Sequence, residues 1–260
     1  MALDLGHKWV SARGVMLTST HLLRRRRFLP LFVTQLFNAF NDNLYKTTMV
    51  LFVVYAVYND ETTEAGFSGL ASALFILPFF ILSALAGQLA DMRDKAKIIR
   101  TVKLCEIGLM MIGAAGLYMA WQGIMVETVA IPLLLLALFL TGVQSTFLGP
   151  IKYAILPQHL KKEEVLAGTG LVEAGTYIAI LAGTILAGPL AVEHTGWAAI
   201  GIIVTACIGY LVSRQVPPAP PMGEIEKLDW HILRASAKLV RDTMHNPEVY
   251  YAILAISFFW

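Results

Sequence analysis

The stretch FLPLFVTQLFNAFNDNLYKTTMVLFVVYAVY, residues 28–58, decides how this chain folds. It is apolar at both ends and carries a line of polar residues inside, namely Gln35, Asn38, Asp42 and Lys46. On an α-helix these positions fall within an arc of about 80° and extend over roughly 16 Å of the axis. Ionisable groups at membrane depth are costly and normally face a bundle interior or a water-filled cavity. The stretch therefore predicts a membrane helix with one functional face.

Two interpretations of this polar line stay open. Four polar positions on one face favour the wall of a path for a polar or charged solute. The alternative is a buried ion pair between Asp42 and Lys46, one turn apart, that only locks the bundle.

Composition places the whole chain in a membrane. It is 57% hydrophobic and 15% charged, with a mean hydropathy of +0.65, whereas soluble domains carry about 25% charged residues. The two cysteines lie in apolar spans and the histidines lack metal-ligand spacing, so we predict no disulfide, no metal site and no cofactor. No His has an Asp five residues later, the spacing of the phospholipid acyltransferase signature. We therefore expect a transporter and not an enzyme, with membrane lipids and no nucleic acid as partners.

Apolar length predicts six spans and the start of a seventh near Tyr250. The six are 28–58, 67–90, 98–121, 129–149, 166–192 and 197–213. The predicted fold is an all-α membrane protein with four parts. These are a basic N-terminal tail (1–27), a six-span half (28–213), a linker with an amphipathic helix (214–248) and the start of a truncated seventh span (249–260).

Positive charge predicts the orientation. Of the 20 Lys and Arg residues, all but Lys46 fall in the N-terminal tail and in every second connection, if Arg100 and Lys103 at the start of span three are counted in the connection after span two. Because cytoplasmic loops carry the excess of Lys and Arg, we expect a multi-pass protein with a cytoplasmic N-terminus. After span six, VPPAPP (216–221) predicts a stiff extended linker. A basic amphipathic pattern from Trp230 to Met244 then favours a helix on the cytoplasmic membrane surface over a soluble packing helix.

The connection after span two contains GQLADMRDKAK, residues 87–97. Gly87 permits close helix approach, Asp91 can receive a helix N-terminus or an arginine, and Arg93 and Lys95 suit the cytoplasm. The run resembles motif A of the major facilitator superfamily, G-x-L-A-D-x-x-G-[RK]-[RK], with Asp94 in place of the second glycine and Ala96 in place of the last basic residue. The resemblance implies that Asp91 gates by contact with the opposite half of the transporter.

Spans four and five carry further signals. Pro150 should interrupt the fourth helix, and Lys152 beyond it either snorkels to the interface or holds an anionic phosphate. Glu173 is placed to pair with a lysine. Small residues recur every four positions in span five, which permits close helix packing; they are Gly175, Ala179, Gly183 and Ala187.

Taken together, several runs resemble the bacterial lysophospholipid transporters of the major facilitator superfamily. They are residues 28–58, PIKYAIL (150–156), GLVEAGT (170–176) and SFFW (257–260), while LLRRRRFLPLFVTQ (22–35) is most like the form fused to a phospholipid acyltransferase and acyl-carrier-protein synthetase. The resemblance implies flipping of lysophosphatidylethanolamine-type lipids across the inner membrane for re-acylation. It also implies that this chain is an N-terminal half whose partners are a C-terminal six-span half and a fused or associated acyltransferase. Asp42 and Asn43 match the family's Asp-Asn pair, and Lys152 matches its span-four lysine.

A lysolipid needs a charged pocket beside an apolar face. Asp42 suits an ammonium and Lys152 a phosphate, while Asn38, Asn41 and Gln144 can take hydroxyls. The full predicted path comprises Gln35, Asn38, Asn41, Asp42, Asn43, Lys46, Gln144, Lys152 and Glu173. Without the resemblance, the residues support only a polar-solute carrier. A small-solute or drug transporter of the same superfamily, or a non-transporting anchor of an acyltransferase, remain the alternatives.

Overall fold

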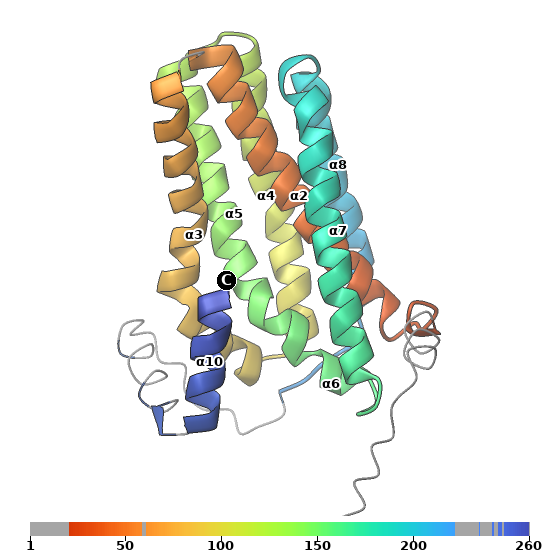
Figure 1. The fold of residues 1–260 in the computed structure, drawn as a ribbon. Coiled ribbons are helices and arrows are strands. Elements are labelled where there is room, and N and C mark those ends of the chain that lie inside the picture. Colours follow the sequence, from red (N-terminus) through yellow and green to blue (C-terminus); the bar gives the residue numbers. More distant parts are fainter. Residues whose placement is uncertain are drawn as a thin grey trace, which may run out of the picture.

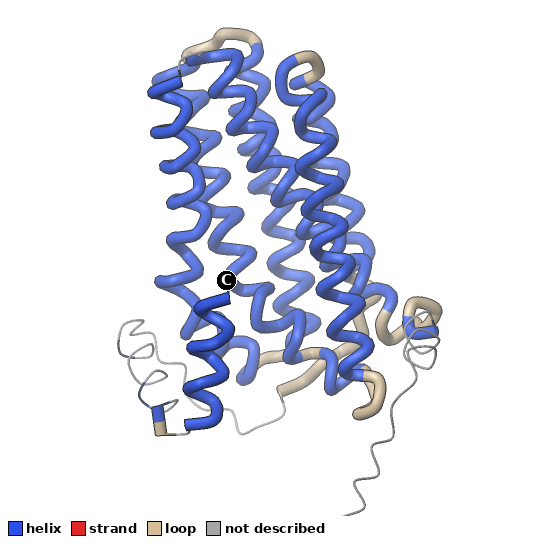
Figure 2. Tube along the Cα trace, viewed as in Figure 1, coloured by secondary structure: helices blue, strands red, loops and turns tan. Residues whose placement is uncertain are grey.

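The computed structural model describes residues 21–58, 61–221 and 247–259, together with 234, 241, 244 and 245. The described part is a bundle of long helices without a strand (Figures 1 and 2). The predicted all-α fold is thereby confirmed. Most of the basic tail and of the amphipathic helix predicted between Trp230 and Met244 lie outside the described residues.

Six long helices form the bundle, close to the predicted spans. Their bounds are α2 Leu29–Phe52, α3 Glu61–Met92, α4 Lys95–Trp121, α5 Ile131–Ala154, α7 Val165–Val192 and α8 Thr195–Ser213. Shorter pieces are the π-helical turns Val53–Tyr58 and Val126–Ala130, the turn α6 (Leu156–His159), and α10 (Pro247–Phe259), which begins where the seventh span was predicted.

Five of the six helices, α3, α4, α5, α7 and α8, are long and apolar enough to cross a membrane. The exception by composition is α2, because its polar residues lower its mean hydropathy. It nevertheless packs within the same bundle, against α7 and α8. A helix of this kind is tolerated in a membrane when its polar side chains face other helices.

Close contacts between helices explain the positions of several glycines. A Cβ atom at Gly183 of α7 would lie 2.5 Å from the carbonyl oxygen of Phe40 on α2, and one at Gly175 would lie 2.6 Å from the Phe32 ring. The small-residue stripe of α7 is therefore a packing surface for α2, as small residues in membrane helices commonly are. On the other side of α2, the Tyr45 hydroxyl donates to the Leu134 carbonyl of α5 at 2.8 Å.

The predicted interruption at Pro150 is wrong. Helix α5 continues through Pro150 to Ala154, and the chain turns only at Ile155 into α6. A proline removes one backbone hydrogen bond, and a membrane helix tolerates this where neighbouring groups cover the freed carbonyl. Lys152 accordingly lies in the last turn of α5 and not in a connection.

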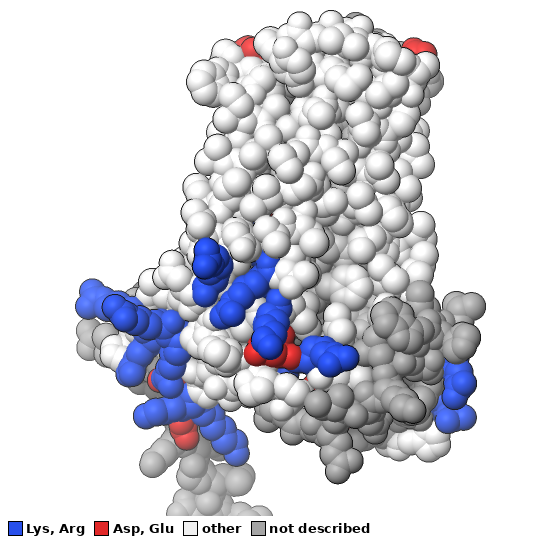
Figure 3. Space-filling model, turned by 180° about the vertical axis from the view of Figure 1, so that it is seen from behind, with Lys and Arg blue, Asp and Glu red and all other residues white. Residues whose placement is uncertain are grey.

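Most of the described Lys and Arg residues gather at one end of the bundle, whereas Figure 3 also shows Asp or Glu side chains at the other end. Seen from behind, Lys and Arg side chains cluster around the α3–α4 connection and the start of α2, while the upper part of this face shows none (Figure 3). The same end holds α6 and the segment after α8 (Figure 1).

We expect this basic end to be cytoplasmic, because positively charged connections are retained on that side. Reporter fusions at Thr62 and His194 should then report a periplasmic location, and fusions at Lys97 and Lys161 a cytoplasmic one. Alkaline phosphatase and green fluorescent protein fusions to the same four positions measure this directly. Inverted signals at both pairs would reject the orientation.

Candidate functional site

Asp42 lies at the centre of a buried polar cluster between α2, α4 and α5. Its Oδ2 atom accepts hydrogen bonds from Asn38 Nδ2 at 3.1 Å and from Ser145 Oγ of α5 at 2.6 Å. Its Oδ1 atom is buried and has no hydrogen-bond partner among the described residues. A buried carboxylate oxygen without a donor is unfavourable, so this position suits a group supplied from outside the described residues.

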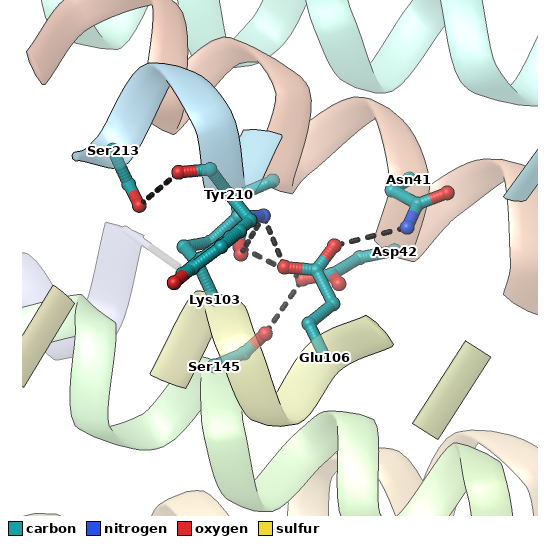
Figure 4. Close-up of polar contacts among 8 residues, drawn as sticks. Asn41, Asp42, Lys103, Glu106, Ser145, Tyr210 and Ser213 are labelled. Atoms are coloured by element: carbon teal, nitrogen blue, oxygen red, sulfur yellow. Dashed lines mark hydrogen bonds and ion pairs between the residues drawn. The ribbon is translucent and has the colours of Figure 1, made fainter. Parts of the chain in front are cut away.

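Behind Asp42, α4 contributes an ion pair that the sequence did not lead us to expect. Lys103 and Glu106 pair with each other, and both side chains are fully buried. Each also contacts α2, since Lys103 Nζ donates to Asn38 Oδ1 at 3.3 Å and Asn41 Nδ2 donates to Glu106 Oε1 at 2.9 Å. Figure 4 shows these side chains turned toward one another.

Counting Lys103 among the residues of a cytoplasmic connection was therefore wrong. It lies more than two turns inside α4, which begins at Lys95, and packs against Gly209 of α8, where a Cβ atom would lie 2.9 Å from Lys103 Cε. The i,i+3 spacing of Lys103 and Glu106 was a usable signal. The nearby basic loop obscured it, because Lys103 was counted with the positive charges of that loop although it lies within the predicted span 98–121.

The predicted Asp42–Lys46 lock does not form between these two described residues. Lys46 is half-buried and turns toward α3, with Nζ 5.3 Å from the centre of the Phe75 ring. A cation over an aromatic face is weakly attracted by it, so Lys46 is held loosely one turn from Asp42. The bundle is locked instead by Lys103 and Glu106.

The remaining polar positions of the predicted path divide into two groups. Gln35 and Gln144 are buried, and Gln35 Nε2 and both amide atoms of Gln144 have no partner among the described residues. Asn43 differs, because its Nδ2 donates to the Ala39 carbonyl of its own helix at 2.8 Å and its Cβ lies against Gly183 of α7. The structure thus gathers Asn38, Asp42 and Ser145 in one cluster but places Asn43 on the packing side of α2.

An ion pair joins α5 and α7 near the basic end. Lys152 Nζ lies 3.6 Å from Glu173 Oε1, with 20% and 33% of the two side chains exposed, and 4.7 Å from the Tyr153 ring. The predicted pairing of Glu173 with a lysine is confirmed. A partly exposed pair of this kind contributes only about 0–1 kcal/mol, so it can open for a competing anion.

At the α3–α4 connection, the aspartate that caps a helix is Asp94 and not Asp91. Asp94 Oδ1 accepts from the backbone N–H groups of Ala96 (2.9 Å) and Lys97 (3.3 Å), which satisfies the start of α4. It also accepts from Ala219 N at 3.2 Å and so ties the proline-rich segment to this connection. The residue that departs from the glycine of the motif therefore has a structural role of its own.

The other motif residues lie differently from the prediction. A Cβ atom at Gly87 would meet nothing within 4 Å, so the close approach expected there does not occur among the described residues. Asp91 and Arg93 are exposed, whereas the Lys95 side chain is buried at the start of α4. Lys95 N donates to the Ala219 carbonyl at 2.9 Å. Hence residues 216–221, predicted as a stiff extended linker, form a strap across the basic end.

His159 of α6 lies beneath this strap. Its ring Nε2 is 3.5 Å from the Pro218 carbonyl, and burial lowers the pKa of the imidazole. The neutral form is therefore favoured here. On the other side of α6, the Lys161 N–H and then the Arg27 guanidinium lower the pKa of Glu164, which keeps the Arg27–Glu164 ion pair charged.

Comparison with known proteins identifies the fold family. The family model of the Major Facilitator Superfamily matches residues 31–260. The chain belongs to this superfamily. Its members that resemble the chain include proteins named lysophospholipid transporter LplT from Cronobacter sakazakii, Pectobacterium carotovorum and Escherichia coli. These are 25% identical over 239 residues, 26% over 236 and 23% over 231, respectively.

The three alignments cover 90%, 88% and 88% of this chain but only 54%, 51% and 53% of those relatives. The chain thus spans about half the length of the curated relatives it matches. Together, the family match and the long apolar helices show a multi-pass membrane protein of a transporter superfamily.

Proposed function

We propose that this chain forms the N-terminal half of a lysophospholipid transporter of the bacterial inner membrane. The observation that carries the proposal is the buried Asp42 carboxylate, whose second oxygen has no partner in the part of the chain that the structure describes. An ethanolamine ammonium would supply the missing donor and charge. The relatives named lysophospholipid transporter LplT support a lysophospholipid as the substrate.

The two cations of the predicted path lie on opposite sides of Asp42. Because Ser145 contacts Asp42, Lys152 lies about 10 Å further along α5 toward the basic end. Lys46 lies about 6 Å along α2 in the other direction. A two-carbon spacer separates the ammonium from the phosphate of the head group, which is short compared with this rise along α5. We infer that Lys46 binds the phosphate while the ammonium lies at Asp42. Lys152 then binds the phosphate at the cytoplasmic end of the path.

The Lys152–Glu173 pair gives a direct test of this order. Glu173→Gln frees the ammonium of Lys152 and should strengthen binding of a phosphate-bearing lysolipid by about two- to fivefold. The reason is that the partly exposed ion pair, which competes with the phosphate, contributes up to about 1 kcal/mol. Lys152→Ala should weaken it by a similar factor. Binding of fluorescent lysophosphatidylethanolamine to the full-length carrier measures both. Equal binding by the two variants would show that the pair lies outside the path.

The function itself is tested by uptake. Spheroplasts that express the full-length carrier should accumulate inner-leaflet lysophosphatidylethanolamine well above vector controls, measured by its conversion to the diacyl lipid. Cationic drugs and small polar solutes should neither be transported nor compete. Uptake of such solutes, without uptake of the lysolipid, would favour a different transporter of the superfamily. Transport of neither would favour a membrane anchor.

Further parts of this proposal concern the partners of the bundle. Asp91 is exposed, which suits a gating contact with a C-terminal six-span half. We also propose that an acyltransferase, fused or associated, consumes the lysolipid on the cytoplasmic side, where the basic end of the bundle would lie.

A further inference from the structure

A groove that the proposed transport path does not use lies at the end of the bundle opposite the basic residues. This groove, of about 760 Å³, runs between α4 and α8. These helices lie on the side of the bundle away from α10 (Figure 1). The wall of the groove consists of small and larger apolar residues. The small ones include Ala114, Ala115 and Gly196, and the larger ones Met111, Ile200 and Ile203.

The rim of this groove has a different character from its wall. Three aromatic side chains, Tyr118, Trp121 and Trp197, line it and are 53%, 49% and 68% exposed. Tyr and Trp with an apolar body and a polar tip are typical of the membrane–water interface. The groove therefore opens at head-group level and continues into the hydrocarbon region, over about 12 Å between Thr195 and Ile203.

The charged and polar groups at the rim favour a lipid head group that carries an ammonium. Glu193 and His194 line the groove, and no Lys or Arg among the described residues does so. A carboxylate beside aromatic faces attracts an ammonium. Helix α8 begins at this rim, and no side chain caps the N–H groups of its first turn, so the adjacent phosphate meets favourable dipoles.

We propose that this groove binds a phospholipid with a primary ammonium head group, of the phosphatidylethanolamine type, from the leaflet opposite the basic end. One acyl chain occupies the space between α4 and α8, and the ammonium lies at Glu193. Since lipid tails are as apolar as the groove, the tail gains little by moving from the bilayer into it. Selectivity must therefore come from the rim. This site is separate from the proposed substrate path, which is enclosed by α2, α4 and α5.

Photo-crosslinking tests the site in the full-length protein. Two probes carry the same diazirine-labelled acyl chain, one on phosphatidylethanolamine and one on phosphatidylglycerol, in vesicles of otherwise identical composition. Mass spectrometry compares adducts on the groove residues with adducts near Leu104 and Leu211, exposed residues of the same two helices nearer the basic end. We expect the ethanolamine-to-glycerol adduct ratio to be about threefold higher in the groove than in the control region. This factor corresponds to the binding free energy that one exposed charge contact contributes.

Two variants separate head-group recognition from simple access. Glu193→Gln should return the groove ratio to the control value without changing total adducts, while Ala115→Trp should fill the groove and lower its adducts for both probes. Gel filtration checks that each variant is folded. Equal ratios in groove and control region, or a groove ratio unchanged by Glu193→Gln, would overturn the proposal. Because the experiment measures phospholipid binding, its result does not depend on whether the protein transports lysolipids.

Discussion

Lys103→Met should destabilise the full-length protein strongly, by about 3–5 kcal/mol in the free energy of unfolding, because it leaves Glu106 as an unpaired buried charge. Both side chains of the pair are fully buried, and Glu106 has one other protein donor, Asn41. Denaturant titration of the purified protein in detergent micelles, followed by circular dichroism, measures the change.

Two controls make this result specific. The double variant Lys103→Met/Glu106→Leu removes both charges and should recover most of the lost stability, because replacing a whole buried pair by apolar residues is often neutral. Arg27→Met breaks the partly exposed pair with Glu164 at the basic end, whose side chains are 32% and 13% exposed, and should cost only about 1 kcal/mol. A loss with Lys103→Met no larger than with Arg27→Met would show that the buried pair does not hold the bundle.

The helices were predictable because apolar length and the 3.6-residue period act locally. The six spans follow from runs of apolar residues bounded by charged connections, and the small-residue stripe of α7 indicated the surface that packs on α2. The continuation of α5 through Pro150 was not predictable, since it depends on which neighbours cover the freed carbonyl group.

Within the candidate site, sequence periodicity identified the polar face of α2 but not the residues of other helices that contact it. The stripe on α2 placed Asn38 and Asp42 on a common face, and the structure brings them into one cluster. It could not show that Ser145 would contact Asp42, because a contact across 103 positions depends on how α2 and α5 pack. For the same reason Lys46, one turn from Asp42, was a reasonable partner from spacing alone, yet its side chain turns to Phe75.

Asp42→Asn should nearly abolish transport of lysophosphatidylethanolamine while leaving the protein in the membrane. The substitution keeps the shape of the side chain and removes the charge that would bind the ammonium. A hydrogen bond to a charged group contributes about 1.5–3 kcal/mol, so uptake at low substrate concentration should fall by about 10- to 100-fold. Uptake into spheroplasts, normalised to the amount of full-length protein, measures this.

Stability distinguishes this role from that of the buried pair. Holding a carboxylate near mid-membrane costs on the order of 3 kcal/mol on insertion scales, so Asp42→Asn should leave stability unchanged or raise it. Loss of transport without loss of stability would mark Asp42 as functional, in contrast to Lys103.

Lys46 supplies the last control. Since Asp42 and Lys46 form no ion pair, Asp42→Asn/Lys46→Met should transport no better than Asp42→Asn alone. If the double variant regained uptake while each single variant failed, the two residues would act as a lock. The free Asp42 oxygen could then not be assigned to the substrate.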